Sequence, residues 1–137
     1  MQENMEKIMM RTKTFIITGQ PVPLARARCS RWRGVVYDSQ KQHKLAIGLQ
    51  LMEQAANMEP FTKATELDIT FFMKPPQKRK ENGGWCVTRP DCSNLLKMYE
   101  DVLQDCRVLQ DDSIIAKIIA RKIYDTKPRT VIVLTEL

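Results

Sequence analysis

Histidine is scarce in this sequence, and its few cysteines are not spaced as metal ligands. The chain of 137 residues contains one histidine, His43, which argues against a histidine-based catalytic triad. None of its four cysteines forms a C-x-x-C pair, so a zinc site is not expected either. The cysteines are Cys29, Cys86, Cys92 and Cys106. We expect all four to be free thiols in a reducing cytoplasm.

Long apolar runs, a signal peptide and internal repeats are also missing. No run approaches the roughly 18 apolar residues that a membrane span needs, so no membrane partner is expected. The absence of a leader pattern favours a cytoplasmic location. The length fits one domain over residues 1–137, and we expect the Met-rich, charged residues 1–12 to be a flexible tail.

Basic residues exceed acidic ones, giving a net charge of +6 and an isoelectric point near 9.3. Charge alone fits an anionic partner about as well as it fits an ordinary basic protein. Two basic clusters favour an anionic partner. One is Arg26, Arg28, Arg31 and Arg33 around Trp32, and the other is Lys78, Arg79 and Lys80 in a long Pro- and Gly-containing loop. Both clusters suit contact with DNA phosphates. The alternative is that both are solvated surface loops.

Hydrophobic periodicity predicts an α+β fold with a single mixed sheet of about four strands and two main helices. The expected strands are residues 14–18, 65–74, 114–124 and 130–135. Residues 114–124 also fit a helical period, and their isoleucine content favours the strand. The expected first helix covers residues 39–57, with a capping box at Ser39 and Gln42 and a core stripe of Leu45, Leu49, Met52 and Ala56.

The stretch 89–113 contains the most informative pattern. Asp91, Ser93 and Asn94 are helix-starting residues that follow Pro90, and an amphipathic helix running to about Arg107 should follow. Its expected buried face is Leu95, Tyr99, Val102 and Cys106, and its polar face is Lys97, Asp101, Gln104 and Asp105. Asp111 and Asp112 then precede the next strand.

This stretch offers carboxylates at two places and a lysine between them. The helix is about 20 Å long at 1.5 Å per residue, so Asp112 can reach Asp91 only if the next strand packs beside the helix N-terminus. With that closure, the cluster would suit Mg²⁺ and phosphodiester hydrolysis. Asp68, on a neighbouring strand, is an alternative additional ligand. The alternative without a functional role is that Lys97 and Asp101, one helical turn apart, form a surface ion pair.

The stretch resembles the signature of the RusA family of Holliday junction resolvases. That signature is a basic residue, an optional proline and D-x-D-N-L-x-K, with a further aspartate ten residues after the first and an Asp-Asp pair twenty residues after it. Identity and spacing match without a gap at Asp91, Asn94, Leu95, Lys97, Asp101, Asp111 and Asp112. The departure is Ser93, where the family usually has aspartate.

The resemblance implies a RusA-like fold and a homodimer that cuts Holliday junctions or other branched DNA by paired hydrolysis. It implies Mg²⁺ as cofactor, with Mn²⁺ as a substitute, bound by Asp91 and Asp112 with help from Asp111, and Lys97 as a catalytic cation. Ser93, Asn94 and Asp101 would have supporting roles. The expected DNA-binding residues are Arg26, Arg28, Lys78, Arg79, Lys80 and Arg89. A nucleoid-associated role in DNA recombination and repair, in a bacterium, phage or prophage, would follow.

Ser93 supports a second hypothesis, a branched-DNA-binding protein that is catalytically weakened or inactive. A hydroxyl is a poorer Mg²⁺ ligand than a carboxylate. The retained Lys97 and the Asp111–Asp112 pair favour the enzyme, because a pure binding protein has no need of them. An ordinary structural protein would require the whole spacing match to arise by chance.

Overall fold

The computed structural model describes residues 10–24, 28–29, 36–37, 40–77 and 83–137. Its centre is a four-stranded mixed sheet in the order β1-β6-β4-β5. The strands are β1 (Thr12–Thr18), β4 (Thr65–Met73), β5 (Ile115–Tyr124) and β6 (Arg129–Glu136). Only β4 and β5 run parallel; β6 is antiparallel to both β1 and β4. The predicted α+β fold, with four strands and two main helices, is confirmed.

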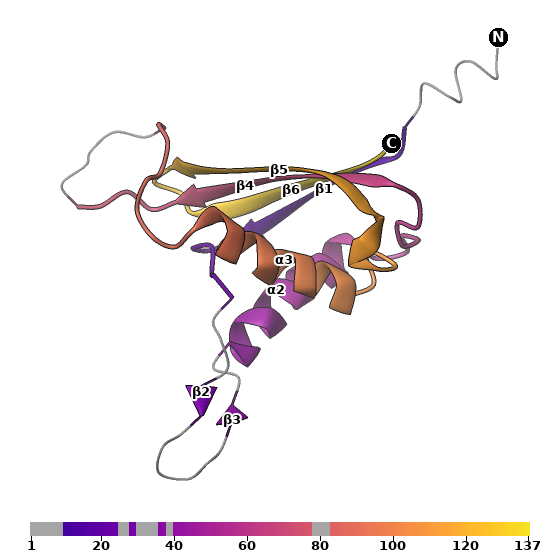
Figure 1. Cartoon of the computed structure of the whole chain (residues 1–137), viewed down its shortest axis with the longest axis horizontal. Helices are drawn as coiled ribbons and strands as arrows, with labels where there is room; N and C mark the ends of the chain where they lie inside the picture. The colour runs from indigo at the N-terminus through magenta and orange to yellow at the C-terminus, as the bar shows by residue number, and fades with distance from the viewer. Residues whose placement is uncertain (1–9, 25–27, 30–35, 38–39, 78–82) are drawn as a thin grey trace.

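Two helices, α2 (Lys41–Gln54) and α3 (Cys92–Asp105), lie on one face of the sheet (Figure 1). A 3-10 turn, η1 (Asp112–Ile114), leads into β5. A short ribbon of β2 (Arg28–Cys29) and β3 (Val36–Tyr37) lies apart from the main sheet and was not predicted. β1 begins at Thr12, inside the range predicted as a tail, and residues 1–9 lie outside the described residues. Among the described residues, no helix is long and apolar enough to cross a membrane.

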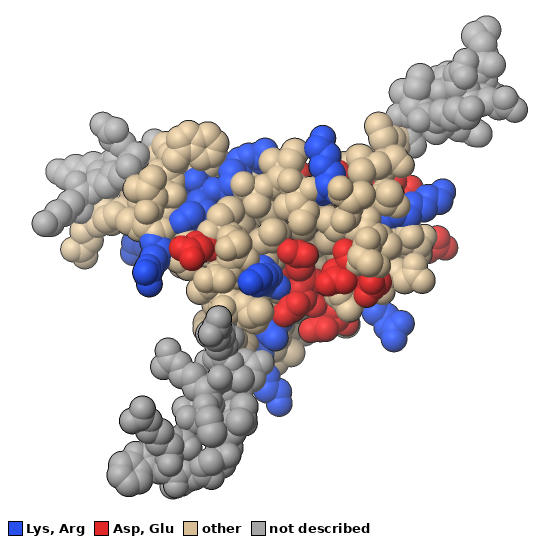
Figure 2. Space-filling model, viewed as in Figure 1, with Lys and Arg blue, Asp and Glu red and all other residues tan. Residues whose placement is uncertain are grey.

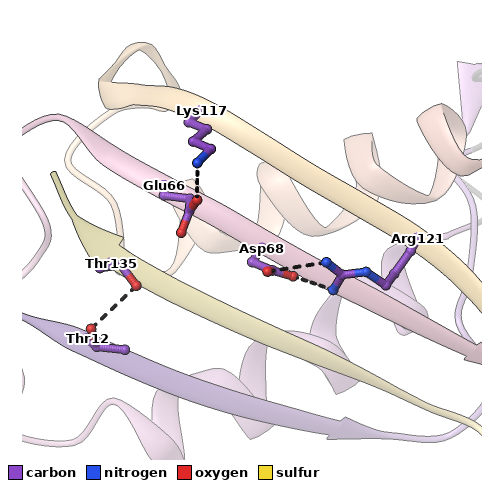
Figure 3. A network of polar contacts seen from close by, with 6 residues as sticks. All are labelled: Thr12, Glu66, Asp68, Lys117, Arg121 and Thr135. Carbon is purple, nitrogen blue, oxygen red and sulfur yellow. Dashed lines mark hydrogen bonds and ion pairs between the residues drawn. The ribbon is translucent and has the colours of Figure 1, made fainter.

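The two faces of the sheet differ in chemistry because side chains alternate along each strand. The helical face carries the apolar core of the sheet, whose fully or almost fully buried residues include Phe15, Ile17, Leu67, Ile69, Phe71, Met73, Ile132 and Leu134. The other face carries ion pairs, Lys117 with Glu66 at 3.1 Å and Arg121 with Asp68 at 2.7 Å (Figure 3). The predicted inward and outward sides of β4 are therefore confirmed.

Helix α3 buries the face that its sequence predicts. Leu95, Tyr99 and Val102 are buried as expected, Cys106 is half-buried, and Met98 and Leu103 widen the buried stripe. The helix ends before Arg107, whose φ of 57° lies in the left-handed region. Five buried side chains on fourteen residues hold α3 firmly against the sheet.

The predicted core stripe of α2 is wrong. Leu45, Leu49 and Met52 are 60% or more exposed, and the buried residues are Ile47, Gly48 and Leu51. Hydrogen bonds to β1 set the orientation of α2. Gln50 and Gln54 accept hydrogen bonds from the backbone N–H groups of Thr18 and Ile16 at 2.9 Å, so the side of α2 that carries these glutamines faces the free edge of β1. The capping box was not observed either, because Gln40 is the N-cap and Ser39 lies outside the described residues.

Two leucines on α2 test this orientation. Leu51→Ala removes a fully buried side chain, so we expect it to lower the free energy of unfolding by about 2–5 kcal/mol. Leu49→Ala, at a position 60% exposed, should change it by less than about 0.5 kcal/mol. Urea unfolding followed by circular dichroism measures both values. Equal losses in the two variants would contradict the observed orientation of α2.

Candidate active site

Asp91 begins helix α3 through its backbone and leaves its carboxylate available. The Leu95 N–H donates to the Asp91 carbonyl oxygen at 3.1 Å, which is the first hydrogen bond of the helix. Asp91 has the extended backbone typical of an N-cap, but its side chain makes no cap hydrogen bond. The residue is exposed. Its carboxylate is therefore presented to solvent, where a cation can reach it.

The segment before Asp91 is attached to the outer edge of β5. Gly83 N–H donates to the Tyr124 carbonyl at 2.8 Å, Tyr124 N–H to the Gly84 carbonyl at 3.1 Å, and Cys86 N–H to the Lys122 carbonyl at 3.0 Å. Burial alone would raise the pKa of the Cys86 thiol, but hydrogen bonds with Thr88 and Tyr124 and the charge of Lys122 together lower it. These contacts give the approach to Asp91 a defined course along the sheet.

Three carboxylates, those of Glu100, Asp101 and Asp112, lie near the C-terminal half of α3 and are called the acidic group below. Asp112 is held there because its N–H donates to Gln104 Oε1 at 3.2 Å. Burial, and then the charges of Asp112 and Asp101, raise the pKa of Glu100, while the charge of Lys97 opposes the shift. Mutual repulsion of this kind is relieved when a cation binds.

Glu100 was missed as a candidate, although a signal for it exists in the sequence. Lys97, Glu100, Asp101 and Gln104 fall at helical spacings of three and four, which places them on one surface of α3. Its proximity to Asp112 depends on the return of the chain after the helix, and a helical period cannot show that return.

Helix α3 separates Asp91 from the acidic group. Asp91 precedes the first turn, whereas Asp112 is bonded to Gln104 in the last turn. Positions 91 and 104 differ by thirteen residue steps, which is about 20 Å of helix. Figure 2 shows the larger acidic surface over the C-terminal part of α3 and the chain that follows it. The contact that the structure gives Asp112 is with Gln104, so the closure onto Asp91 that a single-chain site would require is not observed.

The described residues of one chain do not form a cluster of three or more metal ligands. Within the described ranges, no three His, Cys, Asp or Glu side chains lie close enough together to hold a metal ion. Ligands of one Mg²⁺ must all approach it to about 2.1 Å, which the opposite ends of α3 cannot do together. The carboxylates have the right chemistry for a hard cation, but their positions in one chain do not fit it.

The remaining acidic and polar candidates have clear local environments. Asp111 Oδ2 accepts from the Ser113 N–H at 3.2 Å, and hydrogen bonds from the hydroxyl and backbone of Ser113 lower the pKa of Asp111. Ser93 and Asn94 are exposed on the first turn of α3. No ion pair joins Lys97 to Asp101 in the described part of the chain, so the simple surface pair is not observed.

Asp68 lies on the opposite face of the sheet from both helices. Its carboxylate is bonded to Arg121, which also donates to Thr70 Oγ1 at 2.9 Å (Figure 3). The alternative that Asp68 supplies an additional ligand to this site is therefore wrong.

The chain enters the first basic cluster next to the N-terminal turn of α3. The Leu24 N–H donates to the Asn94 carbonyl at 3.0 Å, two residues before Arg26. Arg89 is exposed beside Asp91, and Arg28 belongs to β2. Arg26 and the predicted cluster of Lys78, Arg79 and Lys80 lie outside the described residues. The described residues next to these clusters are anchored, Leu24 on the first turn of α3 and Gly83 on the end of β5.

A cavity of about 500 Å³ lies between β1, the segment 19–23 and α2, with Tyr99 from α3 at its wall. His43 and Gln50 also line it, and its lining contains no Lys, Arg, Asp or Glu. It therefore contributes no carboxylate to the candidate site.

Comparison with known proteins decides the family. The family model described as "Endodeoxyribonuclease RusA" matches residues 18–135. The chain belongs to the RusA family of endodeoxyribonucleases. It is also 34% identical over 103 residues to a protein of Lactococcus phage r1t named "Crossover junction endodeoxyribonuclease rusA", covering 74% of this chain and 77% of the relative. The sequence prediction of a RusA endodeoxyribonuclease is thus confirmed, and its signature lies on α3 and in the turn before β5.

The raised pKa of Glu100 predicts how stability depends on pH in this RusA-family chain. The unfolded chain ionises Glu100 near its ordinary value of 4.5 and the folded protein at a higher pH, so ionisation penalises only the folded state. Stability falls as pH rises through that window, and the penalty is complete above the folded pKa. Glu100→Gln removes the penalty, so the variant should match wild type at low pH and exceed it at neutral pH.

Thermal melts in EDTA from about pH 4 to about pH 8 measure this difference. Glu53→Gln, at an exposed glutamate on α2, is the matched control for the loss of one carboxylate. A pH-independent difference for Glu100→Gln would show that the acidic group does not act on Glu100.

Proposed function

We propose that this RusA-family chain is a divalent-metal-dependent endonuclease that resolves four-way DNA junctions or other branched DNA. RusA-type resolvases generally depend on a divalent metal. The observation that carries the proposal is that signature carboxylates at the start of α3 and in the turn after it remain exposed, while one face of the helix is buried. Asp91 makes no cap hydrogen bond, and Asp112 uses its backbone rather than its carboxylate to bond Gln104. We propose Mg²⁺ as the ion, with Mn²⁺ as a substitute.

Lys97 supplies positive charge between the two groups of carboxylates. It lies on the exposed side of α3 and acts electrostatically on Glu100. An ammonium there stabilises negative charge that develops on a phosphate during hydrolysis. Arg89 and the basic segments that leave the fold at Leu24 and Gly83 bind the DNA backbone and set its direction across α3.

In a homodimer, signature residues of the two copies would act together in one site. A two-fold axis beside α3 would run the two copies of the helix in opposite directions, so that Asp91 of one copy faces Asp112 and its neighbour Asp111 in the other. Two such composite sites are equivalent, which matches the two-fold symmetry of a four-way junction and gives paired cuts in opposed strands. We place this activity in DNA recombination and repair.

Ser93 is the observation that favours a second candidate, a branched-DNA-binding protein with little or no activity. The side chain stands exposed on the first turn of α3 beside Asp91, at the position where the family usually has aspartate. A hydroxyl there weakens metal binding at the helix N-terminus. This candidate keeps the basic segments and the fold and loses only the cleavage step.

Cleavage of a labelled synthetic four-way junction, with a linear duplex as substrate control, separates the two candidates. We expect wild type to nick the junction symmetrically in Mg²⁺ and not in EDTA. Asp91→Asn should lower the rate by about a hundredfold or more, because it removes a proposed ligand of the metal ion that would stabilise the transition state. Asp105→Asn, at an exposed aspartate at the other end of α3, should cut as wild type does.

Binding of the junction without any cleavage in Mg²⁺ or Mn²⁺ would establish the binding protein instead. Equal cutting by wild type and Asp91→Asn would remove Asp91 from the site. Equal cutting of junction and linear duplex would show a nuclease without preference for branched DNA.

A further inference from the structure

The side chain of Lys122 binds main-chain carbonyl groups next to Asp91. Its ammonium donates to the Thr88 carbonyl oxygen at 2.7 Å and to the Pro90 carbonyl oxygen at 2.8 Å. Both acceptors belong to the three residues that precede Asp91. Hydrogen bonds from a charged donor are shorter and stronger than neutral ones. No signature motif includes Lys122, and the sequence patterns did not single it out.

The Lys122 charge also reaches the first turn of α3. Burial raises the pKa of the Cys92 thiol and the charge of Lys122 opposes the shift, so Lys122 acts on the residue after Asp91 as well as on two of the three residues before it. The backbone of Lys122 also accepts from the Cys86 N–H at 3.0 Å. One residue of β5 therefore holds the chain from position 86 to position 90 through its main chain and its ammonium.

Helix α3 provides no hydrogen bond that fixes the direction of the Asp91 side chain. The Asp91 side chain makes no cap hydrogen bond, so its direction depends on the backbone on either side of it. On the C-terminal side that backbone is helix α3. On the N-terminal side it is the segment 88–90, whose carbonyl groups Lys122 binds.

We propose that Lys122 is a positioning residue that fixes the Asp91 carboxylate by clamping the carbonyl groups of Thr88 and Pro90 to β5. The clamp itself rests only on these contacts, while its effect on cleavage rests on the proposed function above. Lys122 touches neither substrate nor metal in this account, and it acts through Asp91 alone.

Hydrogen exchange tests the clamp in the full chain without any need for activity. In Lys122→Met, which keeps the apolar stem, we expect the amides of Cys86 and Leu95 to exchange about tenfold faster or more, the scale of losing a charge-assisted hydrogen bond. Amides of the β4–β6 ladder should keep their wild-type rates. Lys122→Arg, which can still donate to both carbonyls, should restore much of the protection.

Lys117→Met is the matched control, because Lys117 lies on the same strand and its ammonium pairs with Glu66 on the open face of the sheet. It should leave Cys86 and Leu95 unchanged. If Lys122→Met does not fold, Lys122→Gln removes the same charge with a smaller change in polarity. Wild-type exchange rates at Cys86 and Leu95 in a folded Lys122 variant would overturn the clamp.

Metal titration of junction cleavage then tests the link to Asp91. Lys122→Met should raise the Mg²⁺ concentration for half-maximal cutting by about tenfold, with junction binding in EDTA unchanged and with rescue by Lys122→Arg. An unchanged Mg²⁺ requirement together with faster exchange would overturn the positioning of Asp91. If wild type cuts no junction, the proposed function fails, and the exchange experiment still decides the clamp.

Discussion

Burial of one face of helix α3 against the sheet is the constraint on which the rest of the structure depends. Its five buried side chains face a sheet surface made of Leu67, Ile69 and Phe71 together with their neighbours on β1 and β6. A helix held along its whole length cannot bend to bring its ends together. The polar stripe of α3 is therefore a straight, exposed strip, with Asp91 at one end and the acidic group near the other.

The sheet then supports each end of that strip in a different way. At the N-terminal end, the outer edge of β5 takes the segment 83–86 as an additional short pairing, and Lys122 reaches the carbonyl groups just before Asp91. At the C-terminal end, Gln104 accepts the N–H of Asp112 as the chain turns into β5. The same strand is thus connected to both groups of carboxylates, and it keeps them at a fixed separation.

Much of the fold could be predicted because its signals are local. The strands alternate, as in Leu67, Ile69 and Phe71, and the start and end of α3 follow from its N-cap residue and its apolar spacing. The orientation of α2 could not be predicted from the sequence, since the helix has apolar residues on two sides. Which side is buried is decided by hydrogen bonds from the backbone of β1 to the glutamines of α2. The burial of Leu51 rather than Leu49 is therefore a tertiary effect.

The candidate site, like the fold, could be predicted from the sequence only in part. The motif from Asp91 to Asp112 identified the family, because residue types and spacing are written in the sequence, while the roles of its carboxylates stay a prediction. Their arrangement in space depends on the return of the chain after α3, which placed Asp112 near Glu100 and away from Asp91. The role of Lys122 likewise depends on which carbonyl groups lie opposite a half-buried strand residue, and the sequence pattern contains no sign of that.

The central claim is that Asp91 and Asp112 act in one site although α3 keeps them apart in each chain. Mixed dimers of Asp91→Asn and Asp112→Asn, co-expressed with different affinity tags and purified through both, test it directly. If two copies share each site, every mixed dimer contains one complete site and one site that lacks both aspartates. The account predicts that these dimers nick a single strand of a four-way junction, whereas each parent variant is inactive. Folded mixed dimers that nick no strand would contradict it.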